Sequence, residues 1–407
     1  MQKRYEIIDK IIAAEIYLLI LFMFVTKGEG IRNVLFFSSF FLWLVTLKHR
    51  PNRALLLKPV PALFFIFCGT ILASALFSIE PLYSLKSLLK DPLKSVIMVC
   101  MIATVLSDEK RLRICAYLSG VILVFLLSQG YYSYWAYDLP LMKPITLLRH
   151  SWHARFAMDL NTLLPFTALL FFMSKRTVVR IALGALLITS TAAVLLSTSR
   201  GGMAALFTTA GVWIFLASKQ KNVNWKLIVS GVTVTGMVLA LVLISSSHIK
   251  QRLTDFSTDF ATLHERTDIW GPLVSASLLR PVIGWGYGDD IFSDDRPFQA
   301  TKYKEAPVHI KSAFRNPHNS FLKILFHQGL LGVISYVILL GVVIKSFLQR
   351  ACSFSGLKSL MLIACSSIMF GTYIVNSIVE NPHLTDLALI VGIGCAAMYA
   401  NSEDSDH

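Results

Sequence analysis

The chain has 407 residues, of which 55% are hydrophobic and only 15% are charged, and its formal net charge is +14. Soluble domains carry about a quarter charged residues, so this composition argues against an ordinary soluble protein and indicates lipid as the main solvent. The positive charge gathers in short loops between apolar segments, which is typical of membrane anchoring. Nucleic-acid binding is therefore not predicted.

Apolar runs recur along the whole chain, and each is long enough to cross a bilayer core of roughly 30 Å. We predict an all-α integral membrane protein with about 12 transmembrane helices and one large outer loop. The predicted division is residues 1–245 with helices 1–9, residues 246–317 as the loop with amphipathic helices, and residues 318–407 with helices 10–12. The spans are predicted near residues 11–26, 31–47, 60–78, 94–106, 112–130, 157–173, 178–197, 202–217, 227–245, 320–345, 359–377 and 386–400.

The distribution of basic residues predicts the orientation of the chain. Short loops on the side of the two termini hold 19 Lys and Arg residues, whereas the opposite short loops hold nine. The positive-inside rule therefore places both termini in the cytoplasm. The large loop, residues 246–317, carries nine basic and nine acidic residues and lies outside. Any chemistry is expected on that outer, periplasmic face.

The segment 315–320, with the sequence Arg-Asn-Pro-His-Asn-Ser, leads into the tenth predicted span. Asn is favoured at the N-cap and Pro at the first helical position, so a helix is predicted to begin at Pro317 with His318 in its first turn. The amides at such an end attract anions and disfavour a charged imidazolium. This suits a general base beside a phosphorylated donor. A capping or interfacial histidine is the alternative interpretation.

Two glycines follow His318 at helical spacing. At about 100° per residue, Gly329 and Gly332 both fall within roughly 40° of His318 on a helical projection. The spacing predicts a smooth stripe against which another helix or a lipid tail packs closely. His327, within the apolar span, is interpreted as a hydrogen-bonded structural residue.

Two arginines stand out on the outer side. Arg200 lies in a tight turn between spans seven and eight, and an arginine at the membrane surface is a functional candidate, with snorkelling to headgroups as the alternative. Arg266 recurs with Trp270 and Leu273 at helical spacing, which places it on the inward stripe of an amphipathic helix. An internal salt bridge is the alternative for Arg266.

The remaining outer motifs are less specific. The loop 131–156 combines aromatic residues with Arg149 and Arg155, which fits either interface anchoring or contact with a sugar–pyrophosphate carrier. Residues 284–288 (Gly-Trp-Gly-Tyr-Gly) lack the strand–helix context of a dinucleotide fingerprint and are predicted to form a turn. The four aspartates within 289–295 favour a solvated acidic loop over a cation site. Neither a metal site nor a cofactor is predicted.

Taken together and in this order, the motifs resemble a known family. His318-Asn319, followed by Gly329 and Gly332, resembles the signature of the O-antigen ligases. Two further segments resemble the wider superfamily of O-antigen ligases and polymerases. They are Ser199-Arg200-Gly201 and the series Arg266, Trp270, Pro281 and Gly284-Trp285-Gly286.

The resemblance implies a GT-C-like, lipid-carrier glycosyltransferase of the Gram-negative inner membrane. Such an enzyme moves O-antigen polysaccharide from undecaprenyl pyrophosphate to the lipid A–core on the periplasmic face. It implies His318 as general base, with inversion at the anomeric centre and without a metal. Arg200 and Arg266 would bind the pyrophosphate, with Arg155 and Arg149 as weaker candidates, and the supporting residues would be Asn319, Gly329 and Gly332.

Two alternatives accompany this hypothesis. An O-antigen polymerase or a protein O-oligosaccharyltransferase would use the same donor with another acceptor. A polytopic transporter is the alternative of another class. Transporters often show two similar halves with sites near the membrane midplane, whereas this sequence has no evident internal repeat and few charged residues deep in its spans.

Overall fold

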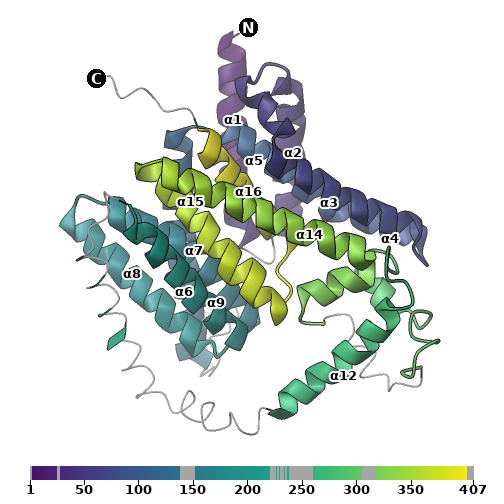
Figure 1. The fold of residues 1–407 in the computed structure, drawn as a ribbon. Coiled ribbons are helices and arrows are strands. Elements are labelled where there is room, and N and C mark those ends of the chain that lie inside the picture. Colours follow the sequence, from purple (N-terminus) through teal and green to yellow (C-terminus); the bar gives the residue numbers. More distant parts are fainter. Residues whose placement is uncertain are drawn as a thin grey trace.

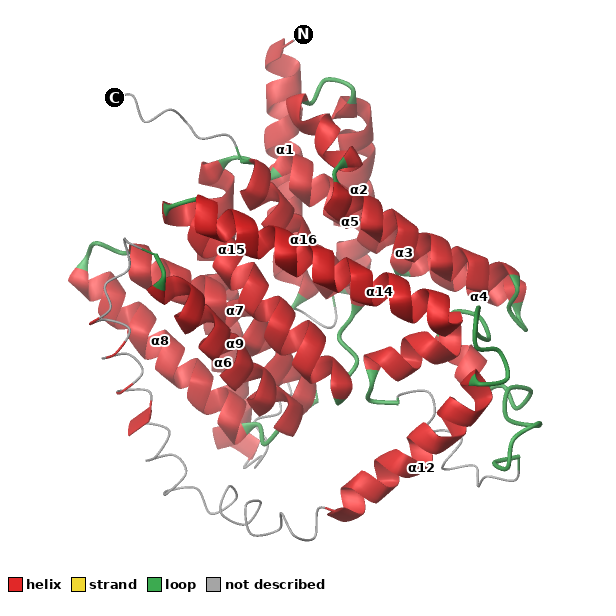
Figure 2. Cartoon of the chain, viewed as in Figure 1, coloured by secondary structure: helices red, strands yellow, loops and turns green. Residues whose placement is uncertain are grey.

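The computed structural model describes residues 2–24, 28–137, 152–220, 260–304 and 317–400, together with residues 226, 229, 233, 236 and 237. Within these residues every regular element is a helix and no strand occurs (Figures 1 and 2). Many large apolar side chains point outward, among them Val34, Phe41 and Phe65. Such outward apolar surface is the expected covering of a protein dissolved in lipid. The predicted all-α membrane class is therefore confirmed for this part of the chain.

The helices follow one another along the chain with short connections. The first group is α1 (Gln2–Met23), α2 (Glu29–Leu47), the 3₁₀ helix η1 (Pro51–Leu57), α3 (Pro59–Leu76), α4 (Pro81–Lys90), α5 (Pro92–Val105) and α6 (Glu109–Tyr137). The second is α7 (His153–Met173), α8 (Thr177–Leu196), α9 (Arg200–Ser218), α12 (Phe260–Ser277) and η3 (Asp289–Ser293). The last is α14 (Ser320–Ser353), α15 (Gly356–Ile368), the π-helix η4 (Met369–Val375), η5 (Asn376–Ile378) and α16 (Leu384–Tyr399). Proline begins η1, α3, α4 and α5 because its missing N–H has no partner in a first turn anyway.

Eight of the described helical segments are long and apolar enough to cross a membrane. They are α2, α3, α6, α7, α8, α9, α14 and the continuous segment Gly356–Ile378. Three further predicted spans coincide with α1, α5 and α16. The predicted span at 227–245 lies largely outside the described residues. The protein is thus a multi-pass membrane protein, while the total of twelve spans, the three-part division and the GT-C-like class remain predictions.

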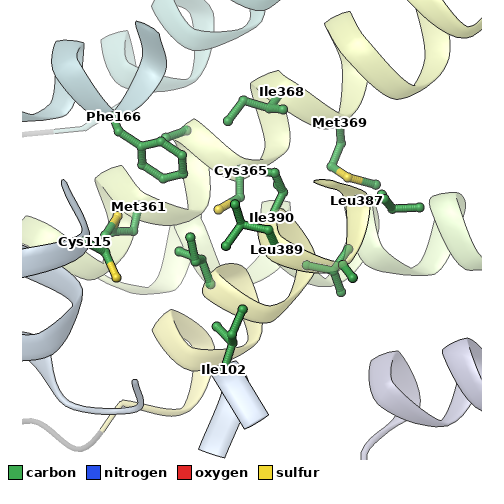
Figure 3. Packing of buried hydrophobic residues seen from close by; sticks show 14 of the residues in the cluster. Ile102, Cys115, Phe166, Met361, Cys365, Ile368, Met369, Leu387, Leu389 and Ile390 are labelled. Carbon is green, nitrogen blue, oxygen red and sulfur yellow. The ribbon is translucent and has the colours of Figure 1, made fainter. Parts of the chain in front are cut away.

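The main core lies where α16 packs against α5 and α15. Figure 3 shows Ile102 of α5, Phe166 of α7, Cys365 of α15 and Ile390 of α16 converging there. Gly392 lets α16 approach α5 closely, because a Cβ atom at that position would lie 2.8 Å from Ile102 Cβ. This buried centre fixes the helices whose ends form the candidate site.

A second apolar cluster holds the outer part of the chain together. We call residues 260–304, with Ser320–Gln328 of α14, the outer subdomain. Figure 1 shows its helix α12 standing apart from the bundle, at the lower right and away from the start of α1. The cluster consists of Leu273, Ala276, Trp285, Ile291, Phe292, Phe298, Leu322 and Phe326. The outer subdomain therefore has a core of its own, which is consistent with the inward stripe predicted for α12.

The long helix α14 is broken at Gly329, which has φ 64° and ψ −160°. The turn at 281–286 fills the break: Leu330 N–H donates to the Pro281 carbonyl at 2.7 Å, and Gly286 N–H donates to the His327 carbonyl at 3.1 Å. A side chain at Gly329 would collide with the Val282 backbone. The predicted straight glycine stripe is therefore wrong, since a projection at 100° per residue does not continue across this break.

His327 is the hydrogen-bonded structural residue that the sequence predicts. Its side chain is buried and its Nδ1 lies 2.7 Å from the Gly286 carbonyl oxygen. The Gly-Trp-Gly-Tyr-Gly segment is likewise a turn, with positive φ at Gly284, Gly286 and Gly288. Together they attach the outer half of α14 to the outer subdomain.

Candidate active site

The starts of α7, α9 and α14 and the link between η5 and α16 meet at one end of the bundle. Close contacts document this meeting. A Cβ at Gly202 of α9 would lie 2.6 Å from Ala157 Cβ of α7, and a side chain at Gly201 would collide with Asn376 of η5. The His318 side chain, just before α14, contacts Glu380 in the link. Residues that are 45 to 175 positions apart are thus in contact at the end that the charge pattern places outside.

His318 does not lie in the first turn of a helix, so this prediction is wrong. The helix begins at Ser320, and its N-cap is Asn319, whose side chain accepts a hydrogen bond from Leu322 N–H at 2.9 Å. His318 itself has φ 49°, a left-handed conformation that is uncommon for a residue with a side chain. The Pro317 carbonyl accepts a hydrogen bond from Trp270 Nε1 of α12 at 2.8 Å. This contact draws the backbone before His318 toward the outer subdomain instead of into the helix.

The imidazole of His318 faces a carboxylate that the sequence did not reveal. His318 Nδ1 lies 3.1 Å from Glu380 Oε2, and the two side chains are 39% and 24% exposed. Ser320 Oγ donates to the Glu380 carbonyl at 3.2 Å. One signal was present in the sequence, because Asn-Pro-His occurs twice, at 316–318 and at 381–383, each time shortly before a helix. Glu380 directly precedes the second copy.

Arg200 is the first residue of α9 and is exposed at the same end. The predicted tight turn is confirmed: Thr198 has φ 54°, and the Ser199 side chain caps α9 by accepting from Gly202 N–H at 3.1 Å. Gly201 packs against Asn376 and Val379, the latter directly before Glu380. Arg200 and His318 therefore both neighbour the short segment 376–380.

Arg155 is held by two carboxylates. Its Nε lies 3.1 Å from Asp159 Oδ1 and its Nη2 lies 2.7 Å from Asp386 Oδ2, while its buried Nη1 has no hydrogen-bond partner among the described residues. These pairs tie the start of α7 to the start of α16 and neutralise the guanidinium charge. The Arg155 charge also lowers the pKa of His383 below its ordinary value.

The other two predicted arginines are less fully defined. Arg266 belongs to α12, but its side chain is outside the described part of the structure, and Arg149 lies outside the described residues. The inward stripe of α12 is confirmed by Leu273 and Ser277, which are buried. Convergence of Arg266 on the site therefore remains a prediction.

Two of the four aspartates within 289–295 pair with basic side chains. Asp289 contacts Lys323 at 3.0 Å, and Asp294 accepts from Arg296, which also contacts Glu80. The hydrogen bond from Arg296 lowers the pKa of Asp294. Within the described ranges no group of three or more potential metal-binding side chains is present. These carboxylates thus link the outer subdomain to α4 and α14.

The geometry suits proton abstraction beside an anionic leaving group. Since Glu380 occupies Nδ1, Nε2 is the ring nitrogen that remains to accept a proton, and the His318 side chain is partly exposed. Arg200 and the N-terminus of α9 provide positive potential beside segment 376–380. A hydroxyl group and a phosphate could therefore be held next to the same segment.

Comparisons with known proteins indicate a family for this sequence. Residues 185–337 match the model of a family described as O-antigen ligase, and this region includes Arg200, Arg266, His318, Gly329 and Gly332. A curated relative, the O-antigen ligase of Salmonella typhimurium (strain LT2), is 26% identical over 203 residues, which cover 48% of this chain and 47% of the relative. The match thus spans about half the length of that relative. The resemblance predicted from the motifs is confirmed.

Proposed function

We propose, from the similarity to the O-antigen ligase family, that this protein is a glycosyltransferase of lipopolysaccharide synthesis. It transfers O-antigen polysaccharide from undecaprenyl pyrophosphate to the lipid A–core, on the periplasmic face of a Gram-negative inner membrane. The observation that carries the proposal is the position of His318 and Arg200, which both lie next to segment 376–380. Both residues fall within the region that matches the family.

The proposed reaction uses His318 as general base. Its Nε2 takes the proton of the acceptor hydroxyl while the hydroxyl oxygen forms a bond to the anomeric carbon of the donor sugar. The bond between that carbon and the pyrophosphate oxygen breaks, and its electron pair leaves on undecaprenyl pyrophosphate. Attack from the face opposite the leaving group inverts the anomeric centre.

The negative charge of the leaving pyrophosphate is assigned to arginines. Arg200 and Arg266 present planar forks that match pairs of phosphate oxygens, and the first amides of α9 add to the positive potential around Arg200. Arg155 and Arg149 are weaker candidates, Arg155 because Asp159 and Asp386 already neutralise it. In this proposal the arginines carry out the charge stabilisation that a metal ion provides in other transferases.

The location of the site suits two lipid-anchored substrates. The site lies at the ends of α7, α9 and α14, each of which is long and apolar enough to span a bilayer. A donor on a polyprenyl chain and an acceptor on lipid A would both arrive in the plane of the membrane. Cytoplasmic termini and an outward-facing site are part of this proposal and rest on the positive-inside distribution of basic residues.

Reconstitution tests the proposal. The full chain in lipid nanodiscs is mixed with undecaprenyl-linked polysaccharide and lipid A–core, and the transfer of polymer to the core lipid is followed on a gel. Wild-type protein and a His49→Ala variant, which changes a histidine beside Tyr5 near the other end of the molecule, should both transfer polymer. His318→Ala should transfer polymer at least about 100-fold more slowly.

Other outcomes would redirect the assignment. Single repeat units joined to one another on the carrier indicate a polymerase, and labelled protein acceptors indicate a protein O-oligosaccharyltransferase. Movement of the donor across the bilayer without transfer indicates a transporter. Full activity of His318→Ala would refute the base mechanism even if the wild-type protein ligates.

A further inference from the structure

His318 is held in an unusual backbone conformation by contacts on both sides. Its φ of 49° is disfavoured for a residue with a Cβ atom and needs support from its surroundings. Trp270 Nε1 fixes the preceding carbonyl, that of Pro317, at 2.8 Å, and Asn319 caps the following helix. Such strain supported by neighbours is common where a side chain must be aimed.

Glu380 is itself anchored on both sides of its backbone. Its N–H donates to the Asn376 carbonyl at 2.8 Å, and its own carbonyl accepts from Ser320 Oγ at 3.2 Å. Glu380 follows η5, whereas His318 is fixed through Pro317 to α12 of the outer subdomain. The 3.1 Å contact between them therefore joins the residue before the N-cap of α14 to the link that follows η5.

The contact also selects one form of the imidazole. A carboxylate can only accept hydrogen bonds, so a neutral His318 beside it carries its proton on Nδ1 and has its lone pair on Nε2. When Nε2 takes a proton, the ring becomes a cation that faces the carboxylate. The partner at Nδ1 thus favours both the reactive tautomer and the protonated product of the step.

We propose that Glu380 is a positioning residue for His318 that orients the imidazole, fixes its Nε2 lone pair toward the acceptor hydroxyl and stabilises the imidazolium as it forms. This inference rests on the proposed function and extends it to a residue outside the region 185–337 that matches the family. Glu380 touches neither substrate in this assignment and acts only through His318.

Steady-state kinetics of three variants at one position test the role. Glu380→Gln keeps the size of the side chain and removes its charge, and we expect kcat to fall about 10- to 100-fold, within the range that base catalysis contributes, with both KM values unchanged. Glu380→Asp keeps the charge and should be more active than Glu380→Gln, and Glu380→Ala should be at least as impaired as Glu380→Gln. Glu80→Gln, which alters an exposed carboxylate of the outer surface, is the matched control and should retain wild-type kcat.

A second measurement separates positioning from general structural support. In a His318→Ala background, Glu380→Gln should cause no additional loss of rate, because residues that act as one unit are not additive. Further loss in that background overturns the proposal. So does a kcat of Glu380→Gln within about threefold of wild type, since base positioning should contribute more than that, or a Glu380→Asp variant no better than Glu380→Gln. Where Glu380→Gln does not fold, the same kcat-against-KM comparison is made with Glu380→Ala, and unchanged kcat overturns the proposal.

Failure of this inference and failure of the proposed function give different results. A wild-type protein without transfer activity overturns the proposed function and, with it, the role of Glu380. If transfer requires His318 but its rate does not change when Glu380 is substituted, only the positioning role of Glu380 is overturned.

Discussion

Two clusters of charged side chains at opposite ends of the bundle use the same residue types in different ways. At the end where α1 and α6 begin, Asp9 pairs with both Arg50, at 2.6 Å, and Arg111. Arg50 is only 8% exposed, and Arg111 also donates to the Val105 carbonyl at 2.6 Å. These arginines join the N-terminal helices through the shared carboxylate.

At the other end the charged groups meet across elements and remain partly accessible. Arg155 lies between two carboxylates, while His318 and Glu380 keep substantial exposed surface. Arg200 is exposed at the start of α9. The comparison teaches that an arginine near the membrane surface is not by itself a functional signal. Its set of partners and its exposure distinguish a structural cation from one that is able to meet a substrate.

Removing the base should have the largest effect on activity. We expect His318→Asn to lower the transfer rate by about 10²- to 10⁴-fold, because proton abstraction by a positioned base contributes about that much. The variant should stay folded, since its side chain is half-exposed and its main partner is a single carboxylate. The transfer rate per folded molecule measures this loss, and a size-exclusion profile shows whether the variant is folded. A fall in folded yield with a normal rate per molecule would instead place His318 with the structural cluster at Asp9.

Removing Asp9, the carboxylate that two arginines share at the opposite end, should lower stability and leave the transfer rate per folded molecule nearly unchanged. Asp9→Ala leaves two guanidinium groups without their carboxylate, and we expect a loss of about 2–4 kcal/mol in the free energy of unfolding. Transfer per folded molecule should remain near the wild-type rate. Thermal unfolding in detergent, compared with the neighbouring surface variant Glu6→Ala, measures the difference. An Asp9→Ala protein that is as stable as wild type would show that the two ends do not differ in this way.

Disturbing the contact of α9 with segment 376–380 should lower both the transfer rate and the stability of the fold. In Gly201→Ala the added methyl group collides with Asn376 and Val379, so the segment that carries Glu380 must shift. Overpacking of this kind destabilises by about 1–3 kcal/mol. We expect the transfer rate to fall by a larger fraction than the free energy of unfolding. Gly211→Ala, in the same helix with open space around it, is the matched control. Equal behaviour of the two variants would contradict the close packing at the site.

Substituting Gly329, at the break in α14, should lower stability and transfer to a moderate degree. Gly329→Ala places a side chain at φ 64° and ψ −160° against the Val282 backbone, and this backbone conformation, which is essentially restricted to glycine, by itself costs about 1–3 kcal/mol. We expect a lower unfolding temperature and a partial loss of transfer, because the outer half of α14 follows His318. Gly341→Ala, further along α14 with no atom near the added carbon, should leave the unfolding temperature unchanged.

The smallest expected effect is a dependence of stability on pH through His383. Because the Arg155 charge lowers the pKa of His383 in the folded protein, the unfolded chain binds a proton more readily. The contribution of His383 is therefore fully present above the unfolded pKa of about 6.5 and is lost as pH falls through the folded value. As the pH falls from 7.5 to 5, the unfolding temperature should decrease less for His383→Asn than for wild type. Parallel curves would contradict this coupling, which solvent keeps small at an exposed side chain.

Sequence alone determined the features that depend on local pattern. Apolar runs predicted helices in lipid because length and hydrophobicity suffice for that decision, and the Ser199–Gly201 turn and the inward face of α12 followed from capping chemistry and helical spacing. His318 and Arg200 were found by their motifs. Their placement at one end of the bundle followed from the alternation of spans.

Tertiary structure decided everything that depends on partners distant in the sequence. Glu380 lies 62 positions from His318, and no local pattern states that the two meet. Trp270 moved the backbone at Pro317 away from a helical start, and the turn at 281–286 broke α14 at Gly329. Each outcome follows from hydrogen-bonding groups that must be satisfied away from water. Which distant group satisfies them depends on how the chain packs as a whole.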